Sequence, residues 1–343
     1  MHPPEAHALR PLGWDDRVAV LVAVQERPDL VPGRVARVDR GRVTVLSEAG
    51  TTRAVPAIGS DVVTGDWVLV DTAVRPPEVR VVLDRKSQFV RGDPMDGRAR
   101  GAQIVAANID TAFVVQSLTT GPNLRRLERE LVLVYESRAE PVVVLNKADL
   151  VAATTAALAR EAVRNVAPDV DVVVTSAATG EGLRALREHA REGETIALIG
   201  ASGAGKSTLV NRLVGEEVQN VGEVRARDQR GRHTTTAREL FVLPDGGVLL
   251  DTPGLRAVAL WDADEGLSRV FGDIEKLALA CRFADCTHKS EPGCAVREAI
   301  ARGELDAARV EHYARLDDEL DETARRRDAQ IANRAMRSFR KAR

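Results

Sequence analysis

The sequence predicts a multidomain fold with a small β-barrel or sandwich, a central α/β domain, and a mostly helical C-terminal domain. Short apolar runs between residues 31 and 83 alternate with turn signals, which is typical of all-β domains. After residue 104, strand-length apolar runs alternate with helical stretches. Beyond residue 270 the pattern is helical except for a Cys/His cluster. The expected domains are therefore 1–100, 101–270 and 271–343.

The first domain contains several short strand signals. The sequence GRVARVDRGRVTVL predicts a hairpin over 33–46 that turns at Asp39–Gly41, because Gly41 permits a tight reversal. Further strands are expected at 51–58, 66–71 and 79–84. Residues 84–103 are rich in Arg, Gly and Asp, which predicts a linker.

The central domain has near-continuous apolar strands, which are typical of a mainly parallel sheet covered by helices on both faces. The strand signals fall at 110–118, 141–150, 171–177, 195–200 and 246–254. Helical patterns lie between them, and the clearest are LRRLERELVLVYESR at 124–138 and GLRALREHAR at 182–191.

Composition indicates a soluble, globular protein. Hydrophobic residues make up 44% and charged residues 29% of the 343 residues, and no apolar run approaches the ~18 residues of a membrane span. The first ten residues lack the apolar core of a signal peptide, and three cysteines are too few for a disulfide framework. We therefore expect a cytoplasmic protein that does not bind membranes.

The C-terminal segment 325–343 is strongly basic although the whole chain has a formal net charge of −2. Such a run is consistent with an arm that binds nucleic acid, and equally with a solvated helix face. Charge alone does not choose between these two interpretations.

A complete phosphate-loop motif, G-x-x-x-x-G-K-S, begins at Gly200 after an apolar strand and before a helix. Its backbone N–H groups and the helix N-terminus favour bound phosphates. We expect Lys206 to reach the β- and γ-phosphates as a catalytic residue, and the Ser207 hydroxyl to ligate Mg²⁺. The expected nucleotide contacts are Gly200, Ala201, Ser202, Gly203, Ala204, Gly205, Lys206, Ser207 and Thr208.

A second motif, Asn146-Lys147-Ala148-Asp149, ends the strand at 141–145. A carboxylate at Asp149 can accept hydrogen bonds from guanine N1–H and its exocyclic amine, whereas adenine presents an acceptor at N1. The Lys147 stem can lie along the purine face. Ser176 and Ala177, which follow the strand at 171–175, are expected to complete the base pocket through a backbone N–H directed at guanine O6. The motif therefore predicts that the nucleotide is GTP or GDP.

The sequence Asp251-Thr-Pro-Gly254 follows the last apolar strand of the domain. Asp251 is a catalytic candidate that would hold Mg²⁺ through water, and the Gly254 N–H is placed to sense the γ-phosphate. Leu255 stands where many GTPases carry the glutamine that orients the attacking water. We expect His233 or a partner to position that water, and slow hydrolysis in the absence of the partner.

The segment 231–236, GRHTTT, lies between the phosphate loop and Asp251. One of its threonines is expected to close over Mg²⁺ and the γ-phosphate when GTP binds. Thr235 is the favoured magnesium ligand and catalytic candidate, and Thr234 is the alternative.

Three cysteines and one histidine form the pattern C-x₄-C-x-H-x₅-C. Three thiolates and an imidazole within 14 residues can close a tetrahedral zinc site without an open position. The expected ligands of one structural Zn²⁺ are Cys281, Cys286, His288 and Cys294. Because the site would be closed, a zinc hydrolase is the least favoured interpretation.

The guanine motif precedes the phosphate loop, the reverse of the usual GTPase order. With this order, and with the segments AANIDTAFVV, RLERELVL, GRHTTT, DTPGLR and CRFADCTHKSEPGCAV, the chain resembles the circularly permuted GTPases called ribosome small-subunit-dependent GTPase A. The resemblance runs from about residue 33 to 300. It implies an OB-type barrel, a circularly permuted GTPase domain, and zinc ligands at the four residues of the Cys/His pattern.

The resemblance also implies a cytoplasmic factor that binds the small ribosomal subunit and its rRNA late in maturation and hydrolyses GTP faster there. Trp67 is the only aromatic residue between 31 and 83, so we expect arginines and backbone, not stacked bases, to contact rRNA. We expect a monomer and no DNA binding. The alternatives are an RNA-binding scaffold that uses GTP as a structural or switch ligand, and a GTPase that modifies or delivers tRNA.

Overall fold

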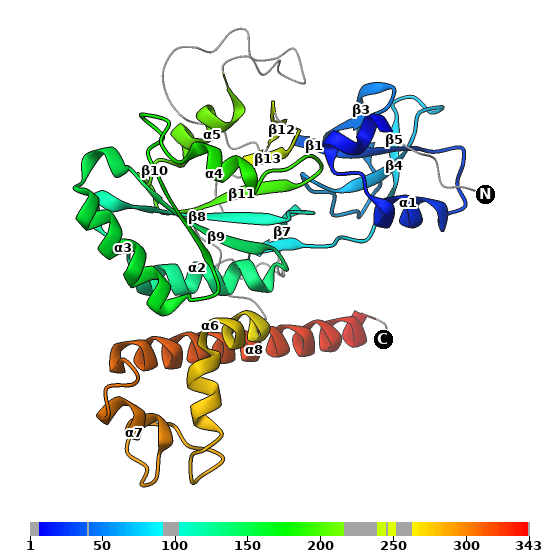
Figure 1. The fold of residues 1–343 in the computed structure, drawn as a ribbon. Helices are drawn as coiled ribbons and strands as arrows, with labels where there is room; N and C mark the ends of the chain where they lie inside the picture. Colours follow the sequence, from blue (N-terminus) through cyan, green and yellow to red (C-terminus); the bar gives the residue numbers. More distant parts are fainter. Residues whose placement is uncertain are drawn as a thin grey trace. The chain divides into compact units, whose positions relative to one another are not determined.

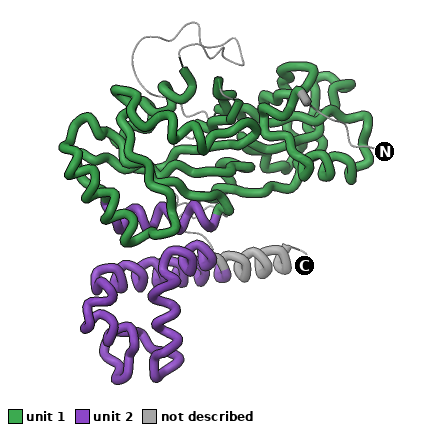
Figure 2. Tube along the Cα trace, viewed as in Figure 1, with its two compact units in different colours: residues 1–90, 104–122, 137–257 green, residues 91–103, 123–136, 258–343 purple. Residues whose placement is uncertain are grey.

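The computed structural model describes residues 7–341 except residues 40, 92–102, 216–238, 245 and 252–262. The chain forms two compact units, shown in Figure 2. Unit 1 contains residues 1–90, 104–122 and 137–257, and unit 2 contains residues 91–103, 123–136 and 258–343.

Five strands form the predicted barrel in unit 1 (Figure 1). They are β1 (Val31–Asp39), β2 (Arg42–Ser47), β3 (Gly50–Pro56), β4 (Trp67–Asp71) and β5 (Glu78–Val82). Strand β1 pairs with both β2 and β4, while β5 pairs with both β3 and β4, so the strands close on themselves. The predicted hairpin is confirmed, because Asp39 pairs with Arg42 across the turn. Valines at alternate positions fill the interior.

The residues before the barrel pack against it. They form η1 (His7–Leu12) and α1 (Asp16–Ala23), whose first turn is capped by the Asp15 carboxylate. Trp14 meets Trp67 edge to face, with ring centroids 5.4 Å apart. Because Trp67 is only 3% exposed, it belongs to the hydrophobic core and offers no surface on which a base can stack.

The central sheet of unit 1 has the strand order β10–β9–β8–β11–β13–β12. Neighbouring strands are parallel except β12, which is antiparallel to β13. The strands are β8 (Thr111–Ser117), β9 (Glu140–Asn146), β10 (Asp171–Thr175), β11 (Thr195–Gly200), β12 (Glu239–Val242) and β13 (Val248–Asp251). The predicted, mainly parallel α/β sheet is therefore confirmed.

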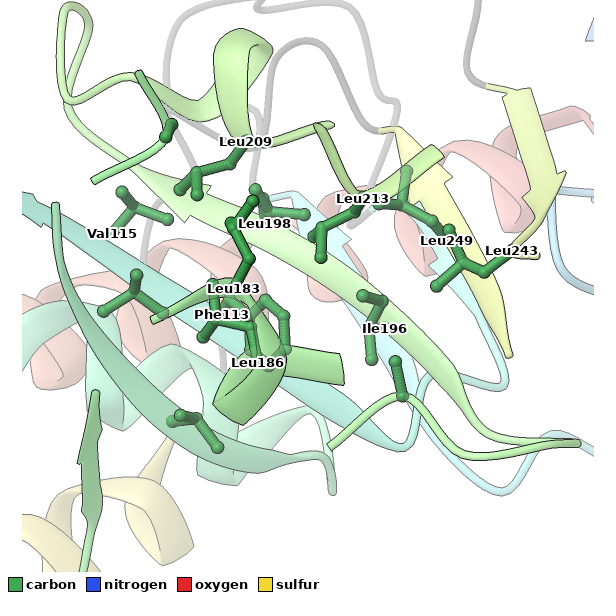
Figure 3. Close-up of a cluster of buried hydrophobic side chains, with 14 of the residues drawn as sticks. Phe113, Val115, Leu183, Leu186, Ile196, Leu198, Leu209, Leu213, Leu243 and Leu249 are labelled. Carbon is green, nitrogen blue, oxygen red and sulfur yellow. The ribbon is translucent and has the colours of Figure 1, made fainter. Parts of the chain in front are cut away.

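Helices cover this sheet. They are α3 (Ala153–Val166), α4 (Leu183–Glu188) and α5 (Lys206–Val214), and two short 3₁₀ turns, η2 (Leu118–Thr120) and η3 (Ala148–Leu150), follow β8 and β9. Side chains of α4 and α5 pack onto β8 and β11, and Figure 3 shows Leu186, Leu198 and Leu209 in this cluster. Each of these three leucines is at most 6% exposed. This core fixes α5 relative to the strand that precedes it.

The barrel and the central sheet join within unit 1. Arg37 of β1 pairs with Glu239 of β12, so the strands form a continuous eleven-stranded sheet. Arg34 of β1 is 1% exposed and donates to three carbonyl oxygens, those of Leu12, Gly65 and Asn108. Burial lowers the pKa of Arg34 to about 10, which still leaves the guanidinium charged at neutral pH. Arg34 therefore ties together the N-terminal segment, the barrel and the start of the central domain.

The predicted linker at 84–103 is partly a strand. Residues Gln88–Arg91 form β6, which pairs with β7 (Gln103–Ala107). Phe89 is 1% exposed, and its burial explains why this part of a polar segment is ordered against the domain.

Unit 2 is mostly helical in the residues that the structure describes. It contains α2 (Leu124–Glu136), α6 (Asp264–Ala278), α7 (Ala295–Ala301) and α8 (Ala307–Lys341). Helix α2 contacts α6 and α8, although it lies between β8 and β9 in the chain. The helical C-terminal pattern is confirmed. Within the described ranges, no helix is both long enough and apolar enough to cross a lipid bilayer.

Candidate functional site

The phosphate-loop motif connects β11 to α5, as its sequence context predicts. Gly200 has φ 133° and Gly205 has φ 95°, both in the region that favours glycine. A Cβ atom at Gly200 would clash with the Val115 carbonyl oxygen, and one at Gly205 with the Asn146 amide. Both glycines are therefore required by conformation and by close packing.

Lys206 is the first residue of α5, and its side chain folds back over the loop. Its Nζ atom donates to the carbonyl oxygens of Gly200 at 2.8 Å and Ala201 at 2.5 Å. Ser207 and Thr208 follow in the first helical turn and are exposed. A cation, an exposed hydroxyl and the positive end of a helix thus meet at one place, which suits a polyphosphate.

Asn146 links the guanine motif to two other loops. Its Nδ2 atom donates to the Ala204 carbonyl oxygen at 2.9 Å, and its Oδ1 atom accepts from the Ala177 N–H at 3.1 Å. The side chain is 1% exposed. Asn146 therefore holds the phosphate loop and the Ser176–Ala177 loop together at the carboxyl ends of β9, β10 and β11.

The next residues present the predicted base-reading carboxylate. Lys147 adopts the left-handed conformation, with φ 71° and ψ 39°, and Asp149 is the middle residue of η3, which follows directly. The Ser176 hydroxyl donates to Asp149 Oδ1 at 2.5 Å and accepts from the Thr179 N–H at 3.1 Å. The Asp149 carboxylate is therefore oriented by a side chain from the neighbouring loop.

That neighbouring loop, residues 176–182, is held by its own backbone and by α5. The Ser176 N–H donates to the Glu181 carbonyl oxygen, and the Gly180 N–H donates to that of Ser176. Arg212 of α5 donates to the carbonyl oxygens of Ala177 at 3.0 Å and Ala178 at 2.7 Å. Sequence reasoning missed Arg212, because no motif spacing connects an arginine on α5 with a loop 34 residues earlier.

Asp251 is the last residue of β13, beside the phosphate-loop strand. Strands β13 and β11 are parallel, with Ala197 opposite Leu250, so Asp251 emerges at the same edge of the sheet as the phosphate loop. The remaining predicted residues of this part of the site lie outside the described residues. They are His233, Thr234, Thr235, Gly254 and Leu255.

The four predicted zinc ligands meet in unit 2. One ligand atom from each of Cys281, Cys286, His288 and Cys294 lies within 4.8 Å of all the others. The Cys281 and Cys294 sulfur atoms are 3.9 Å apart, and His288 Nδ1 is 3.6 Å from Cys281 Sγ and 3.4 Å from Cys294 Sγ. Tetrahedral bonds of ~2.3 Å to sulfur and ~2.05 Å to nitrogen imply separations of about 3.8 and 3.5 Å. The cluster therefore fits a zinc ion.

Local structure brings these ligands together. Cys294 caps the N-terminus of α7, where its sulfur accepts from the Arg297 N–H. The Glu291 carboxylate accepts hydrogen bonds from the Thr287 hydroxyl and from three backbone N–H groups of the ligand loop. These bonds lower the pKa of Glu291 to about 2, and the Thr287 hydroxyl is the largest cause. The loop between Cys286 and Cys294 is thus organised around one carboxylate.

Comparisons with known proteins agree with this arrangement. Residues 82–261 match the family model described as RsgA GTPase, and residues 195–332 match one described as 50S ribosome-binding GTPase. The chain is 46% identical to the small ribosomal subunit biogenesis GTPase RsgA of Streptomyces avermitilis, over 98% of this chain and 92% of that protein. It is 48% identical to the protein of the same name from Streptomyces coelicolor, over 90% of this chain and 86% of that protein.

Solved structures with the same fold include YjeQ from Thermotoga maritima and YloQ, which is described as a circularly permuted GTPase. The YjeQ crystal structure has a TM-score of 0.62 and 25% identity, and covers 85% of this chain and 98% of its own. The YloQ structure has a TM-score of 0.61 and 23% identity, over 86% of this chain and 96% of its own.

Proposed function

The chain belongs to the RsgA GTPase family, and from this premise we propose that it hydrolyses GTP to GDP and phosphate as an assembly factor of the small ribosomal subunit. In this proposal it acts in the cytoplasm, as a monomer, late in the maturation of the subunit. The observation that carries the nucleotide assignment is the Asn146 side chain, which joins the guanine motif, the phosphate loop and the Ser176–Ala177 loop.

Guanine recognition is assigned to Asp149. Its carboxylate would accept from the N1–H and the 2-amine of guanine, while the Ser176 hydroxyl holds the Oδ1 atom in place. Losing one of two paired hydrogen bonds leaves a desolvated polar group, so this contact discriminates strongly against adenine. The Lys147 stem would cover one face of the purine. Its closeness to Gly205, whose Cβ position lies 3.8 Å from Lys147 Cε, supports a compact pocket.

Phosphate binding is assigned to residues 200–208. Lys206 already lies over the loop carbonyl groups, and its ammonium would move onto the β- and γ-phosphates when nucleotide binds. Ser207, Thr235 and Asp251 (through water) would hold Mg²⁺, which neutralises charge that develops on the phosphate oxygens during transfer. The exposed Ser207 hydroxyl and the position of Asp251 at the same sheet edge fit that metal.

Hydrolysis is expected to depend on the ribosome. Leu255 cannot orient water, so His233 or a group of the subunit is assigned that task. Without such a group the attacking water is poorly positioned, and misplacement of a reacting group costs orders of magnitude in rate. Slow turnover in isolation and faster turnover on the subunit follow from this assignment.

The Cys/His cluster is assigned one structural zinc ion. Four protein ligands leave no open position, so the ion would stabilise the fold of unit 2 and would not take part in hydrolysis. Contact with rRNA is assigned to exposed arginines of the barrel, such as Arg42 and Arg53, because Trp67 is buried.

Two ribosomal subunits appear in the descriptions of similar proteins, and the small one is preferred. The match to the family model named for the 50S subunit begins at residue 195, so it does not include the guanine motif at 146–149. The two Streptomyces relatives named for the small subunit each align with at least 90% of the chain.

The test is GTP turnover by the purified protein alone, with small subunits, and with large subunits. We expect small subunits to raise the rate at least ~10-fold, equal to about 1.4 kcal/mol of activation free energy, and large subunits to have little effect. Lys206→Ala should abolish tight GTP binding and the stimulated rate. A turnover rate that small subunits do not raise would contradict the assembly role. Small-subunit binding without any turnover would indicate an RNA-binding scaffold.

A further inference from the structure

The loop that follows β10 has only a few polar groups that can face a base. The Ala177 N–H is already donated to Asn146 Oδ1, at 3.1 Å. The Ser176 and Gly180 N–H groups bond within the loop, as does that of Thr179. Among the described residues of this loop, the N–H groups of Ala178 and Gly182 donate to no acceptor. Gly182 is only partly exposed, at the start of α4, whereas Ala178 is exposed. The Ala178 N–H is therefore the exposed loop donor that remains available to a ligand.

The direction of that donor is set by the peptide between Ala177 and Ala178. In a trans peptide the C=O and the N–H point in opposite directions. Arg212 Nε donates to the Ala177 carbonyl oxygen at 3.0 Å, so this oxygen faces α5 and the Ala178 N–H faces away from it. Arg212 Nη2 also donates to the Ala178 carbonyl oxygen at 2.7 Å, so the planar guanidinium holds two successive carbonyl groups.

We propose that Arg212 is a positioning residue for guanine recognition, which orients the Ala177–Ala178 peptide so that the Ala178 N–H donates to the purine O6. This inference rests on the proposed function, because it requires guanine in the pocket formed with Asp149. Guanine offers an acceptor at position 6 and adenine a donor, so a fixed N–H there attracts the first base and repels the second.

Arg212 also connects the two ends of the nucleotide site. It lies on α5, whose first residue is Lys206, and its neighbours Leu209 and Leu213 are at most 1% exposed in the core. The helix that presents the phosphate-binding lysine thus carries the arginine that holds the base-reading loop. A side chain anchored in this way can control base specificity without touching the nucleotide.

The test combines one substitution in the protein with one change of ligand, and it measures the affinity of wild type and variant for both ligands. Arg212→Met keeps the aliphatic stem but removes both hydrogen bonds. The ligands are GTP and 2-aminopurine riboside triphosphate, which keeps the 2-amine but lacks both O6 and the N1–H. The loss of the N1–H weakens binding of this nucleotide to wild type and variant alike, so the effect of the substitution is compared within each ligand. We expect the variant to bind GTP about tenfold more weakly and the 2-aminopurine nucleotide less than about twofold more weakly, because only GTP loses the O6 contact. Equal weakening for both ligands, or no weakening for GTP, overturns the proposal.

Two further variants sharpen the result. Arg184 is a matched control, because it lies on α4 with its side chain 96% exposed, and Arg184→Met should change neither affinity. Arg212→Lys should prefer GTP over the 2-aminopurine nucleotide more than Arg212→Met does, but less than wild type. The lysine ammonium can donate to one of the two carbonyl oxygens, whereas the planar guanidinium donates to both. An Arg212→Lys protein with no more preference than Arg212→Met contradicts the proposal.

The wild-type protein separates failure of this inference from failure of the proposed function. A wild type that binds ATP as tightly as GTP would refute the guanine site as a whole, and this inference with it. A wild type that prefers GTP, together with an Arg212→Met protein that weakens both ligands equally, would refute only the role of Arg212 at O6.

Discussion

The two units of the molecule are stabilised in different ways. In unit 1 a parallel sheet and its helices bury clusters of Val, Leu, Ile and Phe, and backbone groups and glycines form much of the nucleotide site. In unit 2 the helices are joined by buried and half-buried charges, and the segment between α6 and α7 is organised by three cysteines and a histidine. The nucleotide site should therefore tolerate loss of zinc from the Cys/His cluster, whereas unit 2 should not.

The charged core of unit 2 centres on Glu128 of α2. This carboxylate is 2% exposed, accepts from Arg309 Nε at 2.9 Å, and lies 2.7 Å from His312 Nδ1. A second pair, Arg129 with Glu319, is bidentate at 2.5 and 2.7 Å. These bonds fasten α2 to α8. Unit 1 also contains buried charges, but they lie within the barrel domain and do not join helices: Arg34 bonds backbone carbonyl groups, and Arg85 pairs with Asp66.

The largest expected effect is that of losing the zinc ion assigned to the Cys/His cluster. Cys286→Ser removes a ligand without disturbing Cys294, which caps α7. Zinc binding to a closed cluster supplies about 10 kcal/mol or more of folding free energy, so we expect the variant to lose zinc and the region around the cluster to unfold. Zinc content per chain and hydrogen exchange at Thr287–Ala301 measure both effects.

The matched control for this variant is Ser290→Ala, which lies in the same loop and provides no ligand. It should keep a full equivalent of zinc. GTP affinity should be nearly unchanged in Cys286→Ser if the two units differ as described. A Cys286→Ser protein that retains zinc, or one that loses GTP binding together with zinc, breaks the comparison between the units.

The second expected effect concerns the charges between the helices of unit 2. Glu128→Gln removes the buried negative charge that Arg309 and His312 contact, although Arg309 keeps its pair with Asp273. The free energy of unfolding of unit 2 should therefore fall by about 1.5–3 kcal/mol. Asp321→Asn, in the exposed pair with Arg325 on α8, should cost less than about 0.5 kcal/mol. Urea unfolding followed by circular dichroism measures both, and equal losses would contradict the role of burial.

Much of the fold and the nucleotide site follows from local sequence. The phosphate loop needs glycines at special φ values between a strand and a helix, and these constraints appear as consecutive letters of the chain. The zinc cluster is equally local, with all four ligands within 14 residues. Parallel strands could be predicted because strands buried on both faces read as continuous apolar runs.

Contacts between distant segments could not be predicted. Arg34 resembles any other arginine of a barrel strand until the Leu12, Gly65 and Asn108 carbonyl groups surround it. Glu128 sits in a charged helix whose sequence does not show that its partners lie about 180 residues later. The Arg212 contacts depend in the same way on how α5 packs. The roles of His233 and Thr235 stay predictions, since both lie outside the described residues.

The smallest expected effect tests a buried ion pair in unit 1 by its pH dependence. Asp66 is fully buried and accepts from Arg85 at 2.6 and 2.9 Å and from the Val63 N–H at 2.8 Å. Burial raises the pKa of Asp66 above its ordinary value of 3.8, although the Arg85 guanidinium opposes the shift. Arg85→Met removes that opposition, so the pKa of Asp66 should rise further and the ionised carboxylate should destabilise the fold.

The sign of the pH dependence follows from this direction. A carboxyl group whose pKa is higher in the folded than in the unfolded protein lowers stability once the pH exceeds the folded pKa, and this loss disappears as the pH falls toward 3.8. We therefore expect Arg85→Met to lower the free energy of unfolding by about 2 kcal/mol near pH 7, and by less as the pH falls toward 3.8, in urea unfolding followed by tryptophan fluorescence. Arg80→Met, in a half-exposed pair of the same barrel, should cost little at either pH. If the loss of unfolding free energy in Arg85→Met stayed constant or grew on acidification, Asp66 would not be an ionised carboxylate that Arg85 stabilises.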